Sequence, residues 1–502
     1  MLVFLCGCLL TFLSAFYIFL TWNHQHWTKR GIPFDKPQIL SGNLPSLVNQ
    51  KRHFAYDLDD LYKKFKDGYS IIGFFSMRQP QYLVTDARVA RDILIGKFKY
   101  FHDNDFSDMI DEKKDPIFGN NPFMLKGQLW REARTEITPA FTQLRIKSMY
   151  PIMDEMCERL QKFILREKHE AIEARNMCAN YTTEVLSTCI FGADAGALLD
   201  KKAPIREMGR KLLGFTPTIA LYFFVIQLIP SLRKFIKIGL VPWNGWKFFV
   251  NLMEDSIQMR KGGRELREDY LSYLIELQAK KDLTTHRIMA HAMAFFVCGF
   301  ETSSVVLSFA HYQLAKNADV QEKLRNEIRK IVEKNGKLSY SVIQEMPYLE
   351  QVLCETHRLH PVFPILAKLC TESCEMPLTE HKTVTIEKGY SVILPLHSIH
   401  RDSRYYENPD IFNPERFSPE NGGSKVYRDR GCYLPFGDGP RICPGMRFAQ
   451  TQIKAAIVAI VKDFEVKLDA RTSLEPMLNP EEIIPTIIGG IWLRFTECRE
   501  EI

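Results

Sequence analysis

Long apolar and amphipathic runs with few breaks dominate the chain, and they predict a mainly helical fold. The clearest run extends from Thr284 to Lys316, and its length is typical of a helix buried across a large domain. A second helical pattern covers Met446 to Phe464. Alternation of apolar and polar residues is confined to short stretches such as Thr383 to Leu396, which read as short strands. The predicted fold class is therefore mainly α with small β sheets.

The N-terminal segment, residues 1–28, has no charged side chain and is almost wholly apolar over its first 22 residues. About 20 such residues span the hydrocarbon core of a bilayer. Lys29 and Arg30 follow, and basic residues at such a boundary usually stay cytosolic. A cleaved signal peptide is the alternative, but its usual apolar run is only ~7–15 residues and follows a basic segment that is missing here. We predict a transmembrane anchor, with Trp22 and Trp27 at the membrane interface.

A second apolar run, Leu212 to Leu232, also lacks charged residues. It could be a further membrane span, but Pro217, Gln227 and Pro230 interrupt it, and a basic sequence follows. We therefore favour a shallow contact with the membrane surface that also covers a pocket.

Composition limits the remaining possibilities. The chain has 502 residues, of which 46% are hydrophobic, and no linker or repeat divides it. We predict one large domain over residues 29–502, and the prolines within residues 29–37 separate it from the anchor. The net charge of +6 is mild, and no basic stripe is interleaved with aromatic residues, so nucleic acid is not an expected partner. Twelve cysteines without paired spacing fit a reducing compartment.

The segment 436–445, Phe-Gly-Asp-Gly-Pro-Arg-Ile-Cys-Pro-Gly, carries the most specific chemistry. Cys443 precedes a helical pattern, and the N–H groups and dipole at a helix N-terminus favour a thiolate. Glycines let the backbone pass close to a flat body, and Arg441 can hold an anionic group. These features together indicate a haem with its propionates. Because Pro444 has no N–H, amide donors to the sulfur must come from Gly445 and beyond.

The pattern Phe-Gly-x-Gly-x-Arg-x-Cys-x-Gly, which begins at Phe436, resembles the haem-binding loop of the cytochrome P-450 family at all six fixed positions. The resemblance implies a single large haem domain in which Cys443 is the axial ligand of the iron of haem b. It places Phe436 and Arg441 against the cofactor. An inert cysteine in a Gly-Pro turn before a core helix is the alternative interpretation.

The resemblance implies that Trp130, Arg134 and Lys368 are partners of the haem propionates in addition to Arg441. Trp130 and Arg134 stand one helical turn apart and resemble the Trp-x-x-x-Arg motif of the family, while Arg441 serves the other propionate. The family commonly has another arginine near Lys368. A lysine there keeps the charge but loses the bidentate geometry.

The stretch Cys298-Gly-Phe-Glu-Thr-Ser303 resembles the oxygen-binding part of the family's long central helix. Thr302 can bond back to the carbonyl of Cys298 and open a groove in the helix, and Glu301 can supply protons through water. The resemblance therefore assigns a catalytic role to Glu301 and Thr302. The family usually has Ala or Gly at the position of Cys298, and the bulkier thiol could narrow the pocket.

Two other motifs concern the core and the pocket. Glu355, Arg358 and Arg416 match the Glu-x-x-Arg and Pro-Glu-Arg-Phe motifs, which implies a buried triad that holds the core under the haem. Substrates should be small and apolar. The segments that line the family's pocket supply six aromatic or aliphatic candidates, although each of these residues could equally belong to the core: Phe106, Phe118, Phe295, Phe296, Phe300 and Ile365.

The run from Arg401 to Phe417 looks most like insect detoxification members of the family and their vertebrate relatives. The implied function is a haem-thiolate monooxygenase, which inserts one oxygen atom of O2 into xenobiotics, insecticides, steroids, hormones or fatty acids. The body is expected on the cytosolic face of the endoplasmic reticulum membrane. A thiolate-haem isomerase or dehydratase and a non-catalytic haem sensor are the alternatives; the intact Glu301–Thr302 pair argues against the first.

The sequence has no nucleotide-binding glycine motif, flavin domain or iron–sulfur cysteine set, so electrons must come from another protein. The resemblance implies NADPH–haemoprotein reductase as the donor, with cytochrome b5 as a second candidate. A basic surface on the cysteine side, including Lys126 and Arg131, could dock an acidic flavoprotein.

Overall fold

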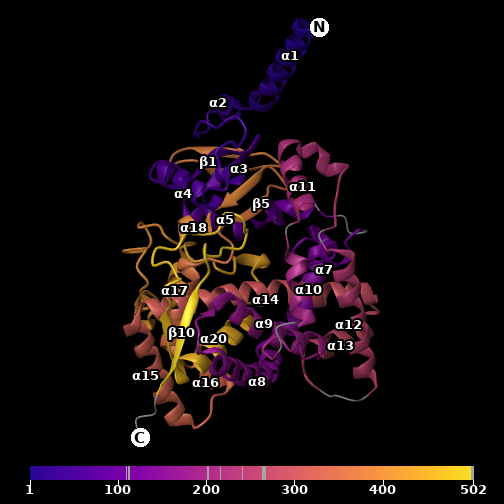
Figure 1. Cartoon of the computed structure of the whole chain (residues 1–502). Coiled ribbons are helices and arrows are strands. Elements are labelled where there is room, and N and C mark those ends of the chain that lie inside the picture. Colours follow the sequence, from indigo (N-terminus) through magenta and orange to yellow (C-terminus); the bar gives the residue numbers. More distant parts are fainter. Residues whose placement is uncertain are drawn as a thin grey trace.

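Helix α14 (Thr285–Lys316) runs through the middle of the body, and most other helices pack around it (Figure 1). The computed structural model describes residues 1–108, 110, 114–199, 203–214, 216–239, 241–262 and 267–498. Thr284 caps the start of α14 because its hydroxyl accepts the N–H of Arg287, and no proline interrupts the helix before Lys316. Helix α9 (Ala174–Phe191), its main neighbour, is almost completely buried, including polar residues such as Thr182 and Glu184. These two helices form the centre of the core.

The elements have the following bounds. The helices are α1 (Leu2–Thr21), α2 (His26–Arg30), α3 (Ser46–Asn49), α4 (Phe54–Phe65), α5 (Ala87–Leu94), α6 (Pro116–Gly119), α7 (Gly127–Ile137), α8 (Gln143–Glu167), α9, α10 (Pro204–Leu213), α11 (Pro217–Leu228), α12 (Trp243–Lys261), α13 (Tyr270–Lys281), α14, α15 (Ala318–Asn335), α16 (Tyr340–Gln344), α17 (Pro347–Leu359), α18 (Leu396–Ile399), α19 (Gly423–Asp429) and α20 (Met446–Asp463). The strands are β1 (Ile71–Ser76), β2 (Gln79–Val84), β3 (Asp103–Asn104), β4 (Ile172–Glu173), β5 (Leu366–Leu369), β6 (Cys374–Pro377), β7 (Thr383–Ile386), β8 (Ser391–Leu394), β9 (Phe464–Leu468) and β10 (Trp492–Glu497). Short 3-10 turns include η5 (Pro414–Phe417) and η7 (Gly439–Arg441).

The strands form small sheets, as predicted. The largest has the order β1-β2-β8-β5-β3, in which only β2 and β8 run parallel. The others have the orders β4-β10-β9 and β6-β7. The alternating stretch from Thr383 to Leu396 supplies strands to two different sheets, β7 to the small hairpin and β8 to the largest sheet. The prediction of a mainly helical fold with small sheets is confirmed.

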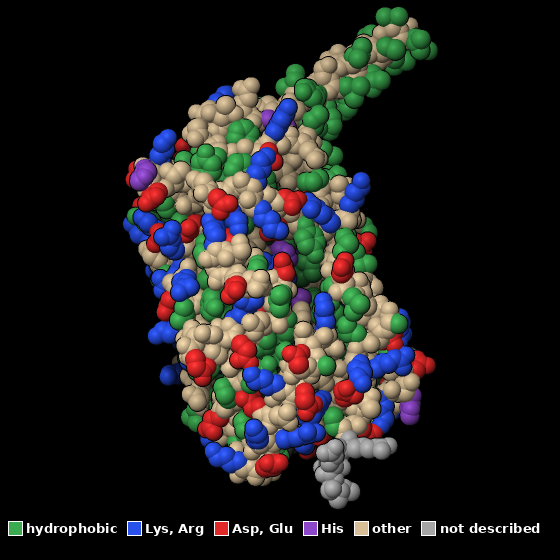
Figure 2. All heavy atoms as spheres, turned by 90° about the vertical axis from the view of Figure 1, so that its left-hand side faces the viewer, with side chains coloured by type: hydrophobic (Ala, Val, Ile, Leu, Met, Phe, Trp, Pro, Cys, Tyr) green, Lys and Arg blue, Asp and Glu red, His purple; other side chains and the backbone are tan. Residues whose placement is uncertain are grey.

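Helix α1 projects from the body as an apolar rod, while charged side chains are scattered over the neighbouring face of the body (Figures 1 and 2). Its apolar residues are exposed except Leu20 near the body and the partly buried Phe19, as expected for a membrane anchor. By length and composition, α10–α11 and α14 could also cross a membrane, but 83% of the α14 span lies inside the protein. Helix α14 is therefore a core helix.

The prediction that Trp27 lies at the membrane interface is wrong. Its side chain is completely buried, and its indole N–H donates to the carbonyl of Phe74 at 3.2 Å. The ring occupies the space left by Gly73 in β1, where a Cβ atom would come within 2.3 Å of it. Trp22, in contrast, is 73% exposed and remains a candidate for the interface. The chain after the anchor thus docks directly onto the largest sheet.

Arg78 connects the base of the anchor to the apolar helix α11. Its guanidinium lies 3.5 Å from the ring centroid of Phe19 in α1, and it donates to the carbonyl of Leu228 at 2.9 Å. Helix α11 lies at the same end of the molecule as α1 (Figure 1). It buries Tyr222 and Ile226 but exposes other apolar side chains such as Leu221. This arrangement supports the predicted shallow membrane contact.

The predicted triad is present and fully buried. Glu355 accepts hydrogen bonds from Arg358 at 2.6 and 2.8 Å within α17, and from Arg416 of η5 at 3.1 Å. Its carboxylate also accepts the backbone N–H of Asn413 at 2.9 Å. One carboxylate therefore joins α17 to the segment that leads toward the cysteine loop.

We predict that Glu355→Ala lowers the free energy of unfolding by about 3–5 kcal/mol and loses haem, because it leaves two buried guanidinium groups without their counter-charge. Urea-induced unfolding and haem content measure the two effects. Glu375→Ala, at an exposed position of β6, is the matched control and should change neither. A Glu355→Ala protein with control-like stability would contradict a structural role for the triad.

Candidate functional site

The cysteine loop is held in a tight backbone conformation immediately before α20. The N–H of Cys443 donates to the carbonyl of Phe436 at 3.0 Å, which closes the loop. Gly439 has a φ of +69°, and a Cβ atom there would lie 2.1 Å from the carbonyl oxygen of Leu94. Only glycine fits this position, so the glycine pattern read from the sequence has a direct steric cause.

The sulfur of Cys443 lies at the N-terminal end of α20 and accepts hydrogen bonds from the backbone N–H groups of Gly445 and Met446. Burial raises the pKa of the Cys443 thiol, whereas these two N–H groups and the nearby Arg134 favour the thiolate and limit the rise. The amide donors follow Pro444 in the sequence, as expected. Without a metal ion the surroundings therefore favour the thiol, and the two N–H groups and Arg134 are the groups that stabilise the thiolate when a metal ion replaces the proton.

A face of α14 lies opposite the cysteine loop. Ala294, Cys298 and Thr302, which are four residues apart, are accessible while most of their neighbours in α14 are buried. The Cys298 side chain is accessible, yet surrounding protein raises its pKa to about 12, and Cys443 interacts with it electrostatically. A side chain that is both accessible and enclosed lies on an internal space. That space separates α14 from the cysteine loop.

Thr302 makes the bond predicted for it: its hydroxyl donates to the carbonyl of Cys298 at 2.5 Å. The predicted partner, Glu301, points elsewhere. It is buried, and its carboxylate accepts two hydrogen bonds from Arg175 of α9. Sequence analysis did not identify Arg175, because no local pattern relates it to a residue 126 positions away.

The sequence predicted Phe295, Phe296 and Phe300 as possible pocket residues, and the structure places all three in the core. Phe295 packs against the rings of Phe141 and Phe448 at 4.9 and 4.8 Å between centroids. With 3.6 residues per turn, Phe296 and Phe300 point away from the face that carries Cys298, whereas Phe295 lies beside that face. Their packing favours the core interpretation for Phe296 and Phe300, and contact of Phe295 with a ligand stays a prediction.

The other three pocket candidates have different positions. Phe118 and Ile365 are partly buried and pack at the edges of apolar clusters. The side chain of Phe106 lies outside the described residues.

Basic groups gather beside the cysteine loop. Arg441 donates to Asp103 at 3.1 Å and to the carbonyl of Leu125 at 2.9 Å, and it lies 4.3 Å from the ring centroid of Trp130. Burial lowers the pKa of Arg441 to about 10, with Asp103 partly opposing the change. Its Nε atom is buried and has no hydrogen-bond partner among the described residues. Arg134 donates to the carbonyl of Ile442 at 2.7 Å.

Lys368 joins the same group through the pairing of β3 with β5. Its ammonium group donates to the side chain of Asn104 at 3.0 Å, and Asn104 is its partner in the strand register. Burial lowers the pKa of Lys368 to about 7, and the neighbouring Arg441 adds to the effect. Asp103 and Asn104 were missed by sequence analysis, since a two-residue strand has no periodicity. Phe436 lies on the other side of the loop, 4.9 Å from the ring of His357.

Comparison with known proteins now identifies the family. The family model "Cytochrome P450" matches residues 32–492 of the chain. The chain belongs to the cytochrome P450 family. It is 39% identical to "Probable cytochrome P450 28a5" of Drosophila melanogaster over 95% of the chain and 96% of that protein. Identity to "Cytochrome P450 6a2" of the same species is 34%, over 94% of the chain and 95% of that protein.

As a cytochrome P450, the protein is a monooxygenase with a haem-thiolate cofactor. The residues present fit that cofactor. The thiol of Cys443 faces an internal space. Beside the loop, the basic residues Arg134, Arg441 and Lys368 gather near Asp103, and the orphaned Nε of Arg441 can take an anionic oxygen. This excess of buried positive charge suits propionate groups.

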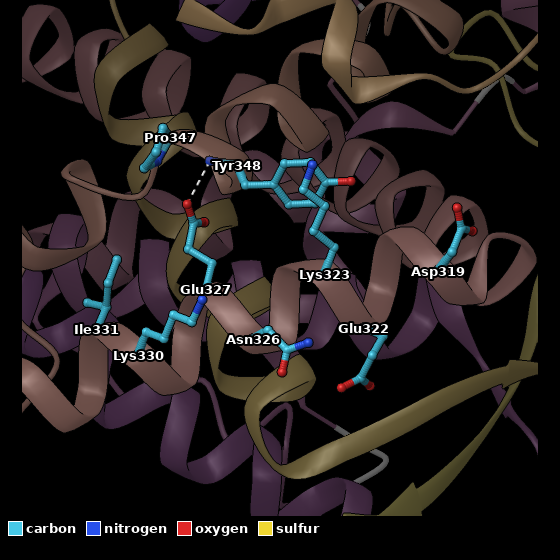
Figure 3. Close-up of a pocket in the computed structure, with 9 residues that line it drawn as sticks. All are labelled: Asp319, Glu322, Lys323, Asn326, Glu327, Lys330, Ile331, Pro347 and Tyr348. Atoms are coloured by element: carbon cyan, nitrogen blue, oxygen red, sulfur yellow. Dashed lines mark hydrogen bonds between the residues drawn. The ribbon is translucent and has the colours of Figure 1, made fainter.

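A hollow on the surface of this P450 lies apart from the candidate haem residues (Figure 3). It is formed where α15 passes the start of α17, and two of its lining side chains, Glu327 and Lys323, already have partners on α17. Glu327 accepts the N–H groups of Tyr348 and Leu349 at 2.8 and 2.9 Å, and Lys323 lies 4.4 Å from the Tyr348 ring centroid. These contacts connect two helices and give the hollow a structural role.

We predict that Cys443→Ser, if folded and haem-loaded, loses the Soret shift that the ferrous carbon monoxide complex of a thiolate-ligated haem shows, because a serine oxygen cannot provide the thiolate. Absorption spectroscopy measures the shift. Cys498→Ser, near the C-terminus, should retain it. Persistence of the shift in Cys443→Ser would exclude Cys443 as the ligand.

We predict that Lys368→Met stabilises the haem-free protein most at or below pH 7. The folded-state pKa of Lys368 is about 7, far below the unfolded value of about 10.5, so burying its charge costs stability at low pH. That cost declines as pH rises from 7 toward 10.5. Thermal unfolding midpoints of both proteins from pH 6 to 10 should therefore converge with rising pH. A constant difference would contradict the depressed pKa.

Proposed function

We propose that the protein is a microsomal monooxygenase that inserts one oxygen atom of O2 into small apolar molecules. The observation that carries the proposal is the Cys443 sulfur at the start of α20, close enough to interact with Cys298 on the accessible face of α14 that also carries Thr302. The reaction is RH + O2 + 2e− + 2H+ → ROH + H2O. Haem held through the Cys443 thiolate supplies oxygen activation when bound, and electron donation by the thiolate favours cleavage of the O–O bond.

Other side chains bind the propionates and transfer protons. Trp130, Arg134, Arg441 and Lys368 hold the propionates by hydrogen bonds and charge. Thr302 orders water in the groove that its bond to the helix carbonyl opens, and Glu301 moves protons toward it.

Apolar substrates suit the described surroundings of the internal space. Its α14 face consists of Ala294, the Cys298 thiol and Thr302, with no charged side chain among them. The thiol of Cys298 makes this face bulkier than an alanine would. Xenobiotics, insecticides, steroids, hormones and fatty acids all match this chemistry.

Residues 1–28 form the membrane anchor in this proposal, and residues 29–502 form the catalytic domain on the cytosolic face of the endoplasmic reticulum. The apolar surface of α1 and the exposed apolar side chains of α11 at the same end support this placement. Substrates that partition into the lipid would reach the domain from that side.

The electron donor in this proposal is NADPH–haemoprotein reductase, and cytochrome b5 is a second candidate. Exposed basic side chains lie on the elements next to the cysteine loop: Arg131 in α7, Lys425 in α19 and Arg447 in α20. Lys126 is partly buried at the start of α7 and contributes less surface. Such a surface attracts an acidic flavoprotein.

We predict that the anchored protein with reductase, NADPH and O2 consumes NADPH and releases a hydroxylated product from an apolar substrate that gives a binding spectrum. Rising ionic strength should slow this turnover because it screens the docking charges. Glu301→Gln with Thr302→Ala should lower product formation by about 10²-fold or more. Rearrangement of a peroxide without reductase would instead support an isomerase, and haem binding without any turnover would support a sensor.

A further inference from the structure

Arg78 is a buried cation at the point where the base of the anchor, the largest sheet and α11 meet. It lies in the turn between β1 and β2, and only 7% of the residue is exposed. In the part of the chain that the structure describes, no Asp or Glu forms an ion pair with it, and burial alone lowers its pKa. At Arg441, in contrast, Asp103 opposes the same change. A guanidinium buried without a counter-charge lowers the stability of a protein unless an anion binds beside it.

The hydrogen bonds of Arg78 leave one of its buried donors unused. Nη1 donates to the carbonyl of Leu228 in α11 at 2.9 Å. Nε is buried and has no hydrogen-bond partner within the described ranges of the chain. A charged donor that is buried without an acceptor is costly in free energy, and a guanidinium forms its strongest hydrogen bonds with anionic oxygens. The Nε–H group of Arg78 is therefore suited to a phosphate or carboxylate oxygen.

Two polar neighbours of Arg78 also have unused hydrogen-bonding atoms. Nε2 of His24, which follows α1, is buried without a partner among the residues described, and Arg78 interacts with His24 electrostatically. In α11 the backbone carbonyl of Gln227 accepts the side-chain N–H of Gln79 at 3.3 Å, while the Oε1 atom of Gln227 is buried and has no such partner. Unused polar atoms therefore occur on all three segments that meet at Arg78.

Apolar side chains on both neighbouring helices show which kind of molecule could bring the anion. The guanidinium of Arg78 lies 3.5 Å from the ring centroid of Phe19 in α1 and 6.0 Å from that of Trp22, which is exposed. Helix α11 exposes Leu221 and Phe224 and lies at the same end of the molecule as α1 (Figure 1). Tryptophan side chains are enriched at the level of lipid headgroups. In the proposed membrane placement, Arg78 therefore lies at the headgroup level, between two helices with apolar surfaces.

We propose that Arg78 binds the phosphate of one anionic phospholipid, whose acyl chains lie against the exposed apolar side chains of α1 and α11. A phosphate oxygen accepts the unused Nε–H of Arg78 and supplies the missing counter-charge. His24 and Gln227 provide further hydrogen-bonding atoms for the headgroup. The inference rests on the membrane placement within the proposed function, and it is independent of the oxidation chemistry. The bound lipid joins the anchor to the body beside the helix that covers the pocket.

The test measures which lipid remains bound to the full-length, haem-loaded protein. The protein is placed in bilayer nanodiscs of phosphatidylcholine and phosphatidylglycerol in equal amounts and is then released into mild detergent. Native mass spectrometry counts the lipids that remain bound. Phosphatidylglycerol carries its only charge on the phosphate, so it should be retained about tenfold more than phosphatidylcholine, the ratio expected for one hydrogen bond to a charged group.

Three variants assign the preference to a residue. Arg78→Gln removes the cation and its donors, so the two lipids should be retained equally. Arg78→Lys keeps the charge but lacks the planar arrangement of donors, and its preference should be intermediate. Arg88→Gln removes the same charge from a side chain that is 86% exposed, and the preference should not change. The Soret spectrum of each variant reports whether the protein is folded and loaded with haem.

Several outcomes would overturn the lipid site. Equal retention of the two lipids by the unaltered protein would do so without any variant. An undiminished preference in folded Arg78→Gln would attribute lipid binding to the basic surface as a whole. Inorganic phosphate should not displace phosphatidylglycerol because it has no acyl chains, and displacement would indicate a site for a free anion instead. Failure of the full-length protein to float with phosphatidylcholine vesicles would refute the proposed membrane placement itself.

Discussion

The position of the cysteine loop depends on one buried carboxylate. Glu355 neutralises Arg358 and Arg416, and Arg358 in turn donates to the carbonyl of His400 at 2.8 Å. Nε2 of His400 accepts the N–H of Leu434, two residues before the loop begins. Charges in the interior are tolerated only with their partners, so this series of bonds has a single stable arrangement. These bonds fix the position of the cysteine loop relative to α17.

The same requirement explains the other side of the site. Several cations are buried beside Asp103, and burial lowers the pKa of both Arg441 and Lys368. Burying such an excess of positive charge lowers the stability of a protein unless an anion binds beside it. Haem propionates are such anions. In the proposed arrangement, cofactor binding and folding would be coupled through charge as well as through the bond to the Cys443 sulfur.

Much of this arrangement could be predicted from sequence, because it depends on local patterns. The central helix was expected over residues 284–316 and occupies 285–316, and the glycines of the cysteine loop follow from steric contacts within a few residues. The partners of Glu301 and Arg441 could not be predicted, since ion pairs between distant segments leave no periodic signal. The position of Trp27 could not be predicted, because an aromatic residue after an apolar helix fits both a membrane interface and the space above Gly73.

Arg78 restricts how far the N-terminal helix α1 can move relative to the body. Because it holds both Phe19 of α1 and the carbonyl of Leu228 in α11, the anchor cannot swivel freely like a tether. A transmembrane helix changes its tilt when the bilayer becomes thinner or thicker. In this protein a change in the tilt of α1 also turns the body, because the contacts of Arg78 connect the two. With the proposed membrane placement, the thickness of the host membrane would set the depth at which α11 meets the lipid.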